Sequence, residues 1–313
     1  MKKYIDIRDA IFEELYEIAL KDKKVVVFTV DTGAQIFKKF KETIPSQFYN
    51  LGIAEQNAMS VAAGLAFTGR RVFVYGIANF VTLRCFEQIK IDIVSMKLPV
   101  TILGSGTGYF YGEDGLTHHM TDNLAIMMTL PGLTILSPSS CSMAASLIHR
   151  AYEMDGPNFI WFDKGVPPAL GEENGQNFSI GANLLKSGKD VLIISAGAMM
   201  QETFKIAEEL NKGGISAGIL DLYCLKPLNK EFLLKSLKEV KKVITLEEHT
   251  VSGGLGGIIC EFLAENDLLL PVKIFGIPDV FHCEVGDREY LRSLDKLDTS
   301  HIVEDIKNWL NLK

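Results

Sequence analysis

The chain has 313 residues, of which 47% are hydrophobic and 23% charged, a composition typical of a globular protein with a full core. The formal net charge of -7 argues against binding to nucleic acids or anionic membranes, because such binding needs clustered Lys and Arg. No apolar run approaches the ~20 residues of a membrane-spanning helix, and the N-terminus has the pattern of a charged helix rather than a signal peptide. The five cysteines are far apart and form no CxxC pair, which favours free thiols in a reducing compartment. We therefore expect a cytoplasmic protein that binds neither nucleic acid nor membrane.

Short β-branched runs alternate with amphipathic helical patterns in the first half of the chain. Unbroken apolar strands joined by helical crossovers indicate a parallel sheet that is covered on both faces. Strands are predicted at residues 25–30, 47–51, 72–75, 100–103, 133–136 and 158–162. Helices are predicted between them, among others at residues 54–68, 83–96 and 141–153.

A second, shorter α/β set follows a stretch rich in Pro, Gly, Glu and Asn around residues 165–181, which reads as a linker. Strands are predicted in it at residues 191–195, 216–221, 242–246 and 272–275, and helices at 200–211, 230–240 and 299–312. The fold class predicted from this order is α/β, with two doubly wound domains. We expect the first domain at residues 1–168, the linker at 169–182 and the second, smaller domain at 183–313.

A lone carboxylate, Glu55, stands at the start of the predicted helix 54–68, directly after a glycine that ends an apolar run. The helix is rich in small residues, which allow neighbouring backbone to approach closely. A glutamate in the first turn often only answers the helix dipole. A functional role for Glu55 therefore depends on the other motifs of the chain.

Phe80 and Arg84 follow the predicted strand at residues 72–75. Open α/β sheets bind ligands at the carboxyl ends of their strands, where an aromatic ring can stack on a flat heterocycle. Taken alone, Phe80 fits a core position better than a binding site.

A glycine-rich loop at residues 104–119 carries Asp114 and two adjacent histidines, His118 and His119. Its spacing matches neither a P-loop nor a GxGxxG turn that opens a helix. Imidazole titrates near neutral pH and suits proton transfer. A metal site is the competing interpretation, but adjacent residues project differently and no third ligand is evident, so we predict no metal site in this chain.

A last motif, Glu247-Glu248-His249, precedes a glycine cluster at residues 253–257. Glycines that open a helix after a strand either bind an anion or allow tight packing of helix and sheet. We favour packing here, and the role of His249 stays open.

Together these motifs closely resemble the carboxyl-terminal section of the transketolase family of thiamine diphosphate enzymes. Residues 52–57 match its GIAEQ signature, 112–118 its GEDGxTH loop, 247–256 its EEHxxxGGLG form and 276–279 a motif near the end. Four motifs in order, at separations typical of the family, make the resemblance specific, and it covers nearly the whole chain. It implies a pyrimidine-binding domain followed by a transketolase C-terminal-like domain.

The resemblance also implies a role for each matched residue. Glu55 would hydrogen-bond the aminopyrimidine ring of thiamine diphosphate and so activate the cofactor, while Phe80 would stack on that ring and Arg84 would lie beside it. Asp114 and His118 would face the substrate, contacting donor hydroxyls and assisting proton transfer. His119 replaces the usual glutamine of the family and receives no assigned role.

The Gly-Asp-Gly motif and the later Asn that hold Mg²⁺ and the diphosphate in this family are absent from the chain. The resemblance therefore implies a split enzyme, in which an N-terminal transketolase-like subunit holds Mg²⁺ and the diphosphate. The expected assembly is an α₂β₂ heterotetramer with a homodimeric core. It would transfer a two-carbon ketol unit from a ketose donor to an aldose acceptor.

The substrate is predicted only as a sugar or a sugar phosphate. Family members that act on sugar phosphates place basic residues around the phosphate. The arginine that is usual near the end of the pyrimidine-binding domain gives way here to Asp163 or Lys164. Lys164 offers a point charge rather than a bidentate fork, and we take it as a candidate substrate contact.

Three alternatives stay open at this point. A 1-deoxyxylulose-5-phosphate synthase-like subunit shares the GIAEQ signature and a DGxTH loop, although that group commonly lacks Glu before Asp114. A 2-oxoacid dehydrogenase E1 beta-like subunit is similarly split but lacks the GEDGxTH and EEHxxxGGLG forms. A non-catalytic scaffold paralogue would keep the fold, but the intact Glu55, Phe80 and His118 argue against it.

Overall fold

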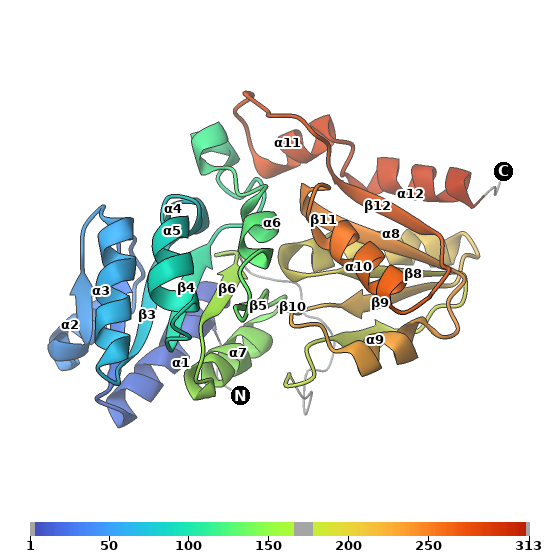
Figure 1. Ribbon diagram of the computed structural model, residues 1–313. Coiled ribbons are helices and arrows are strands. Elements are labelled where there is room, and N and C mark those ends of the chain that lie inside the picture. Colours follow the sequence, from blue (N-terminus) through green and yellow to red (C-terminus); the bar gives the residue numbers. More distant parts are fainter. Residues whose placement is uncertain (1–3, 166–177, 311–313) are drawn as a thin grey trace. The chain divides into compact units, whose positions relative to one another are not determined.

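The computed structural model describes residues 4–165 and 178–310, which fall into two compact units (Figure 1). Unit 1 takes Met1–Gly106 and Ile126–Ser179, and unit 2 takes Thr107–Ala125 and Ile180–Lys313, as far as these ranges are described. The glycine-rich loop after residue 106 thus belongs to unit 2, although its sequence position suggested the first domain. The expected domain bounds stay predictions, and residues 169–177 of the expected linker lie outside the described residues.

Unit 1 is built on parallel strands in the order β5-β6-β4-β3-β1-β2. The strands are β1 (Val25–Thr29), β2 (Phe48–Asn50), β3 (Arg71–Ile77), β4 (Val100–Ser105), β5 (Thr134–Leu136) and β6 (Asn158–Phe162). The helical elements are α1 (Ile7–Lys21), α2 (Phe37–Thr43), η1 (Pro45–Gln47), α3 (Glu55–Phe67), α4 (Ala78–Thr82), α5 (Phe86–Gln88), the π-helical η2 (Ile89–Val94) and α7 (Cys141–Glu153). α6 (Asn123–Met128) contains the boundary between the units.

Every residue of β1, β4 and β6 is buried, which shows that both faces of this sheet are covered, as in other parallel sheets. α1 packs against α7, whereas α3 packs against β3, η2 and α5. An aromatic cluster fills part of the core, with ring centroids 4.7 Å apart for Phe12 and Tyr75 and 4.9 Å apart for Phe37 and Phe48.

Unit 2 has the strand order β12-β11-β8-β9-β7, parallel except for the antiparallel pair β7–β9. The strands of this sheet are β7 (Asn183–Lys186), β8 (Val191–Ser195), β9 (Ala217–Asp221), β11 (Lys242–Thr250) and β12 (Val272–Ile277), and the short β10 (Cys224–Lys226) lies outside it. The helical elements are η3 (Gly112–Asp114), η4 (Leu116–His118), η5 (Gly197–Met199), α8 (Met200–Lys212), α9 (Lys230–Leu237), α10 (Leu255–Glu265), α11 (Arg288–Leu294) and α12 (Thr299–Trp309). α10 packs on β11 and β12, and α8 packs on α12. The predicted α/β class with two domains is confirmed, and the second sheet is mixed because β7 runs antiparallel to β9.

One predicted helix differs from the structure. The span 83–96 is not continuous, because the chain bends after α4 at Leu83–Cys85, forms the short α5 and continues as the π-helical η2. The bend lies at Arg84, whose side chain donates a hydrogen bond to Glu55, 29 positions earlier in the chain. Among the described residues, no helix combines the length and the apolar character needed to cross a bilayer.

Candidate active site

The turn that leads into α3 is fixed by one asparagine at the end of β2. The Asn50 side-chain oxygen accepts hydrogen bonds from the amides of Asp31 and Gly52, both at 3.0 Å. Gly52 has a φ of +72°, a conformation that favours glycine. This turn delivers Glu55 to the first position of α3.

Glu55 does not cap its own helix but pairs with Arg84. Its carboxylate is only 4% exposed, and Oε2 accepts a 2.9 Å hydrogen bond from Arg84 Nη1. The Arg84 guanidinium also lies over the Phe80 ring, 4.4 Å from its centroid. The three residues predicted to contact the cofactor thus lie together in unit 1. The flat guanidinium of Arg84 contacts both the Glu55 carboxylate and the Phe80 ring.

Cys85 completes the wall beside this group and was not singled out by the sequence. It is fully buried, and its Sγ donates to the Phe80 carbonyl at 3.2 Å. Burial, helped by the negative charge of Glu55, raises the pKa of the thiol to about 12. The thiol therefore stays protonated and acts as a small apolar neighbour.

Lys164 lies two residues beyond β6 and is half-buried. Burial lowers its pKa, and smaller contributions come from Tyr75 on β3, from Arg8 in the first turn of α1 and from Asp6, the N-cap of that helix. Lys164 thus belongs to unit 1, as Glu55 does.

The predicted substrate residues Asp114 and His118 belong to unit 2. Asp114 is exposed, and His118 is half-buried with Nδ1 3.0 Å from Thr117 Oγ1. His119 is 4% exposed and packs edge-on against the Tyr109 ring at 5.1 Å between centroids. Burial lowers the His119 pKa, so the ring is a neutral packing element. Within the described part of the chain, no three His, Cys, Asp or Glu side chains are grouped so that they could hold a metal ion.

Glu248 is the centre of an ion-pair cluster behind this loop. Arg288 Nε donates to both of its carboxylate oxygens, at 3.0 and 2.8 Å, and Arg292 donates to them at 2.9 and 3.0 Å. Burial alone would raise the Glu248 pKa, but the charges and hydrogen bonds of the two arginines lower it to about 2. Arg288 also donates to the carbonyl and the hydroxyl of Thr107, two residues after the end of β4.

Glu247, the preceding residue, caps α10. Its carboxylate accepts hydrogen bonds from the amides of Leu255 at 2.6 Å and Gly256 at 2.9 Å. A Cβ at Gly254 would lie 1.9 Å from Glu247 Oε2, so the glycine makes room for the cap. These contacts favour the packing interpretation of the glycine cluster.

His249 is 2% exposed and ties β11 to α6. Its Nε2 accepts from the Ala125 amide at 3.3 Å, and its Nδ1 lies 2.7 Å from the Thr250 carbonyl. Burial lowers the pKa of the imidazole to about 4. A neutral His249 therefore has a structural function in unit 2.

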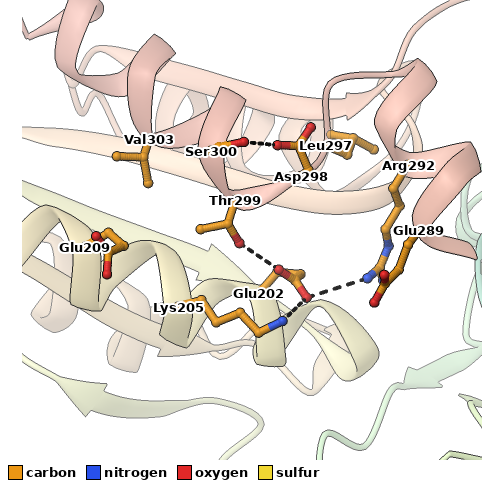
Figure 2. Close-up of a pocket in the computed structure, with 10 residues that line it drawn as sticks. All are labelled: Glu202, Lys205, Glu209, Glu289, Arg292, Leu297, Asp298, Thr299, Ser300 and Val303. Carbon is orange, nitrogen blue, oxygen red and sulfur yellow. Dashed lines mark hydrogen bonds and ion pairs between the residues drawn. The ribbon is translucent and has the colours of Figure 1, made fainter.

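Unit 2 also holds a pocket of about 540 Å³, lined by residues of α8, of α11 and of the first turns of α12 with the segment before it (Figure 2). Glu202 on α8 accepts hydrogen bonds from Lys205 and Thr299, both at 2.8 Å, and lies 3.8 Å from Arg292 Nη1. Arg292 thus joins the wall of this pocket to Glu248.

The predicted residues therefore form two groups, one in each unit. Sequence reasoning missed Arg288 and Arg292. They lie 40 and 44 positions after Glu248, respectively. Their spacing of four places both on one face of α11, and this is the signal that a search for buried-carboxylate partners needs.

The chain matches two family models along most of its length. The model for the transketolase pyrimidine-binding domain matches residues 3–168, and the model for the transketolase C-terminal domain matches residues 181–302. The chain belongs to the transketolase family, as its sequence motifs indicated.

Individual relatives show which members of this family the chain resembles. A relative from Phocaeicola vulgatus, described as one of the subunits of an apulose-4-phosphate transketolase, is 36% identical over 277 residues, which cover 88% of each chain. A solved structure described as a split gene transketolase, inactive beta4 tetramer, has a TM-score of 0.86 and 32% identity, and the match covers 99% of this chain and 100% of that one. The chain is thus similar, along nearly its whole length, to single subunits of split transketolases.

A longer relative relates the chain to a second branch. The 1-deoxy-D-xylulose-5-phosphate synthase of Halothermothrix orenii is 35% identical over 301 residues, 93% of this chain but 46% of that protein. The chain spans about half the length of this relative. Enzymes of both branches depend on thiamine diphosphate.

Proposed function

We propose that this chain is the ketol-transferring C-terminal subunit of a two-subunit transketolase. Together with an N-terminal partner it would move a two-carbon ketol unit from a ketose to an aldose. The single observation that carries the proposal is the buried carboxylate of Glu55 at the head of α3, grouped with Phe80 and Arg84.

These residues fit the pyrimidine half of thiamine diphosphate. The guanidinium of Arg84, a flat cation, already contacts both the Glu55 carboxylate and the Phe80 ring. A flat, protonatable heterocycle needs the same two partners, a buried hydrogen-bond acceptor and an aromatic face. Glu55 and Phe80 would hold the ring, and Arg84 would border it.

When bound, the cofactor supplies a carbon nucleophile that stabilises the negative charge of the transferred unit. Glu55 would hold a proton at the ring nitrogen that faces it. Asp114 would accept hydrogen bonds from donor hydroxyls, and His118 would exchange protons with the sugar oxygens.

Part of the site would come from a partner subunit. This chain lacks the Gly-Asp-Gly motif that supplies oxygen ligands for Mg²⁺ in the family. We propose that the partner holds Mg²⁺ and the diphosphate, in an α₂β₂ heterotetramer in the cytoplasm. In support, the solved relative that contains only the matching subunit, a beta4 tetramer, is described as inactive.

Isothermal titration calorimetry tests this division. The purified chain should bind no thiamine diphosphate in the presence of Mg²⁺, and the chain mixed with its partner should bind it with one site per pair. Tight, stoichiometric binding to the chain alone would overturn the split site.

The substrate is proposed as a sugar or sugar phosphate, with Lys164 as one contact. Its single charge would attract a phosphate without the two-point grip of arginine. A Lys164→Met variant of the assembled enzyme should raise KM for phosphorylated sugars and leave KM for unphosphorylated sugars unchanged. Equal effects on both would exclude a phosphate contact.

A synthase-like activity is the second candidate, favoured by the 35% identity to the Halothermothrix orenii enzyme. Such an enzyme decarboxylates pyruvate before it joins the product to an aldehyde. Release of CO₂ from pyruvate by the assembled enzyme would select this candidate, and ketol transfer without CO₂ release would select the first.

A further inference from the structure

We propose that Glu248 is a positioning residue that, through Arg288 and Arg292, fixes the loop carrying Asp114 and His118 for sugar binding. This inference rests on the proposed function. All of the contacts that carry it lie within unit 2.

The cluster is built to keep a charge buried. Glu248 is 5% exposed, and each of its two oxygens accepts hydrogen bonds from both arginines. A buried carboxylate is stable only when it is paired and hydrogen-bonded in this way. Because the arginines occupy both oxygens, the geometry of the cluster is tightly determined.

The first contact of the loop with this cluster is at Thr107. Arg288 Nη2 donates to the Thr107 hydroxyl at 3.0 Å and to the Thr107 carbonyl at 3.3 Å. The next residue, Gly108, leaves no room for a side chain, because a Cβ there would lie 2.3 Å from Glu248 Cγ. Its φ of +51° is also a conformation that favours glycine.

The loop also returns to the same point. Gly108 and Met120 form an antiparallel bridge, with their amides donating to each other's carbonyls at 3.2 and 2.9 Å. Between these ends, Tyr109 donates to Asp295 at 2.6 Å, and the Gly286 amide donates to the Gly112 carbonyl at 3.4 Å. The stretch is thus held at its base, while Asp114 lies exposed farther along it.

The chain supplies a matched control at the adjacent position. Glu247 is a buried carboxylate on the same strand, but it bonds the start of α10 instead of the arginines. Replacement of either glutamate by glutamine removes one buried carboxyl group from β11, yet only the change at Glu248 should reach the loop.

The first test is hydrogen–deuterium exchange on the isolated chain, which requires no partner or substrate. In Glu248→Gln and Arg288→Lys, amides in residues 107–120 should exchange at least tenfold faster than in the wild type, with α3 unchanged. Glu247→Gln should accelerate α10 and leave residues 107–120 unchanged. If Glu248→Gln does not fold, Arg288→Lys decides, because it keeps the positive charge but lacks the second arm that reaches Thr107. Unchanged exchange at 107–120 in the folded variants would overturn the proposal.

The second test uses the assembled enzyme with thiamine diphosphate, Mg²⁺, D-xylulose 5-phosphate as donor and D-ribose 5-phosphate as acceptor. Arg288→Lys should raise the donor KM at least tenfold and leave exchange of the cofactor C2 proton within twofold of the wild type. A parallel loss of donor turnover and C2 exchange would indicate a general structural role and overturn the positioning role. If the wild type itself shows no C2 exchange, the proposed function fails, and hydrogen–deuterium exchange at residues 107–120 still decides whether Glu248 fixes the loop.

Discussion

Glu247 and Glu248 are neighbours on β11 whose carboxylates have opposite protonation behaviour. Burial raises the pKa of Glu247 to about 7, although the hydrogen bonds that its carboxylate accepts from two α10 amides lower the pKa. The pKa of Glu248 lies at about 2, because Arg288 and Arg292 outweigh its burial. Successive residues of a strand face opposite sides, so one carboxylate caps a helix and the next binds the arginines.

The pH dependence of stability should reveal an opposition between Glu247 and His249. Glu247 has a raised pKa, so its contribution is fully present below about pH 4.5 and is lost as the pH rises through about 7. His249 has a lowered pKa, so its contribution is present above about pH 6.5 and is lost as the pH falls through about 4. Glu247 Oε2 and His249 Nδ1 lie 3.9 Å apart, so the two groups titrate as a coupled pair.

Single substitutions should separate these two effects. On going from pH 7 to pH 5, Glu247→Gln should lose stability relative to the wild type and His249→Gln should gain it, each on the order of 1–3 kcal/mol. Urea unfolding at the two pH values measures the changes, with the exposed Glu153→Gln as control. Identical pH responses in all four proteins would contradict the assignment.

The glycine cluster before and within α10 offers a second prediction from adjacent positions. A Cβ at Gly256 would lie 2.6 Å from the Ile274 side chain on β12, whereas a Cβ at Gly257 would meet nothing within 4 Å. Gly256→Ala should destabilise the chain by roughly 1–3 kcal/mol through overpacking. Gly257→Ala should stabilise it by roughly 0.5–1 kcal/mol, because alanine favours the helix.

Chemical unfolding of both α10 variants checks this pair. The two substitutions add the same methyl group to the same helix, so a difference between them reports the packing alone. If both variants shift in the same direction, the glycines do not serve close packing of helix and sheet.

Arg84 should stabilise the folded chain mainly through Glu55. Removal of the guanidinium leaves a carboxylate that is 4% exposed without its 2.9 Å partner. Arg84→Met should therefore destabilise the protein by roughly 1–3 kcal/mol at pH 7. In a Glu55→Gln background the same change should cost much less. A double-mutant cycle measures the coupling, and additive effects of the two substitutions would show that the pair is not an energetic unit.

Local sequence patterns predicted the elements that are stabilised locally. The helix at 141–153 coincides with α7, where the Ser140 hydroxyl accepts from the Met143 amide as an N-cap. The strand at 158–162 coincides with β6, whose five residues are all buried. Capping and apolar runs are visible in the sequence without any tertiary contact.

Long-range contacts were not visible in this way. The break near Arg84 accompanies a hydrogen bond to Glu55, 29 positions earlier, which hydrophobic periodicity does not register. The division that places residues 107–125 in unit 2 likewise accompanies contacts to Glu248, Arg288 and Asp295. The motif residues were found from the sequence, whereas the arginines that hold their loop required the structure.

The most direct measurement of the central claim is exchange of the cofactor C2 proton, followed by NMR in the chain assembled with its partner, thiamine diphosphate and Mg²⁺. Glu55→Gln should slow this exchange by at least 10³-fold. The thermal midpoint of this variant and its assembly with the partner should stay close to those of the wild type and of the control variant Glu153→Gln. Exchange at the wild-type rate in folded, assembled Glu55→Gln would contradict the assignment of Glu55 as the carboxylate that activates the cofactor.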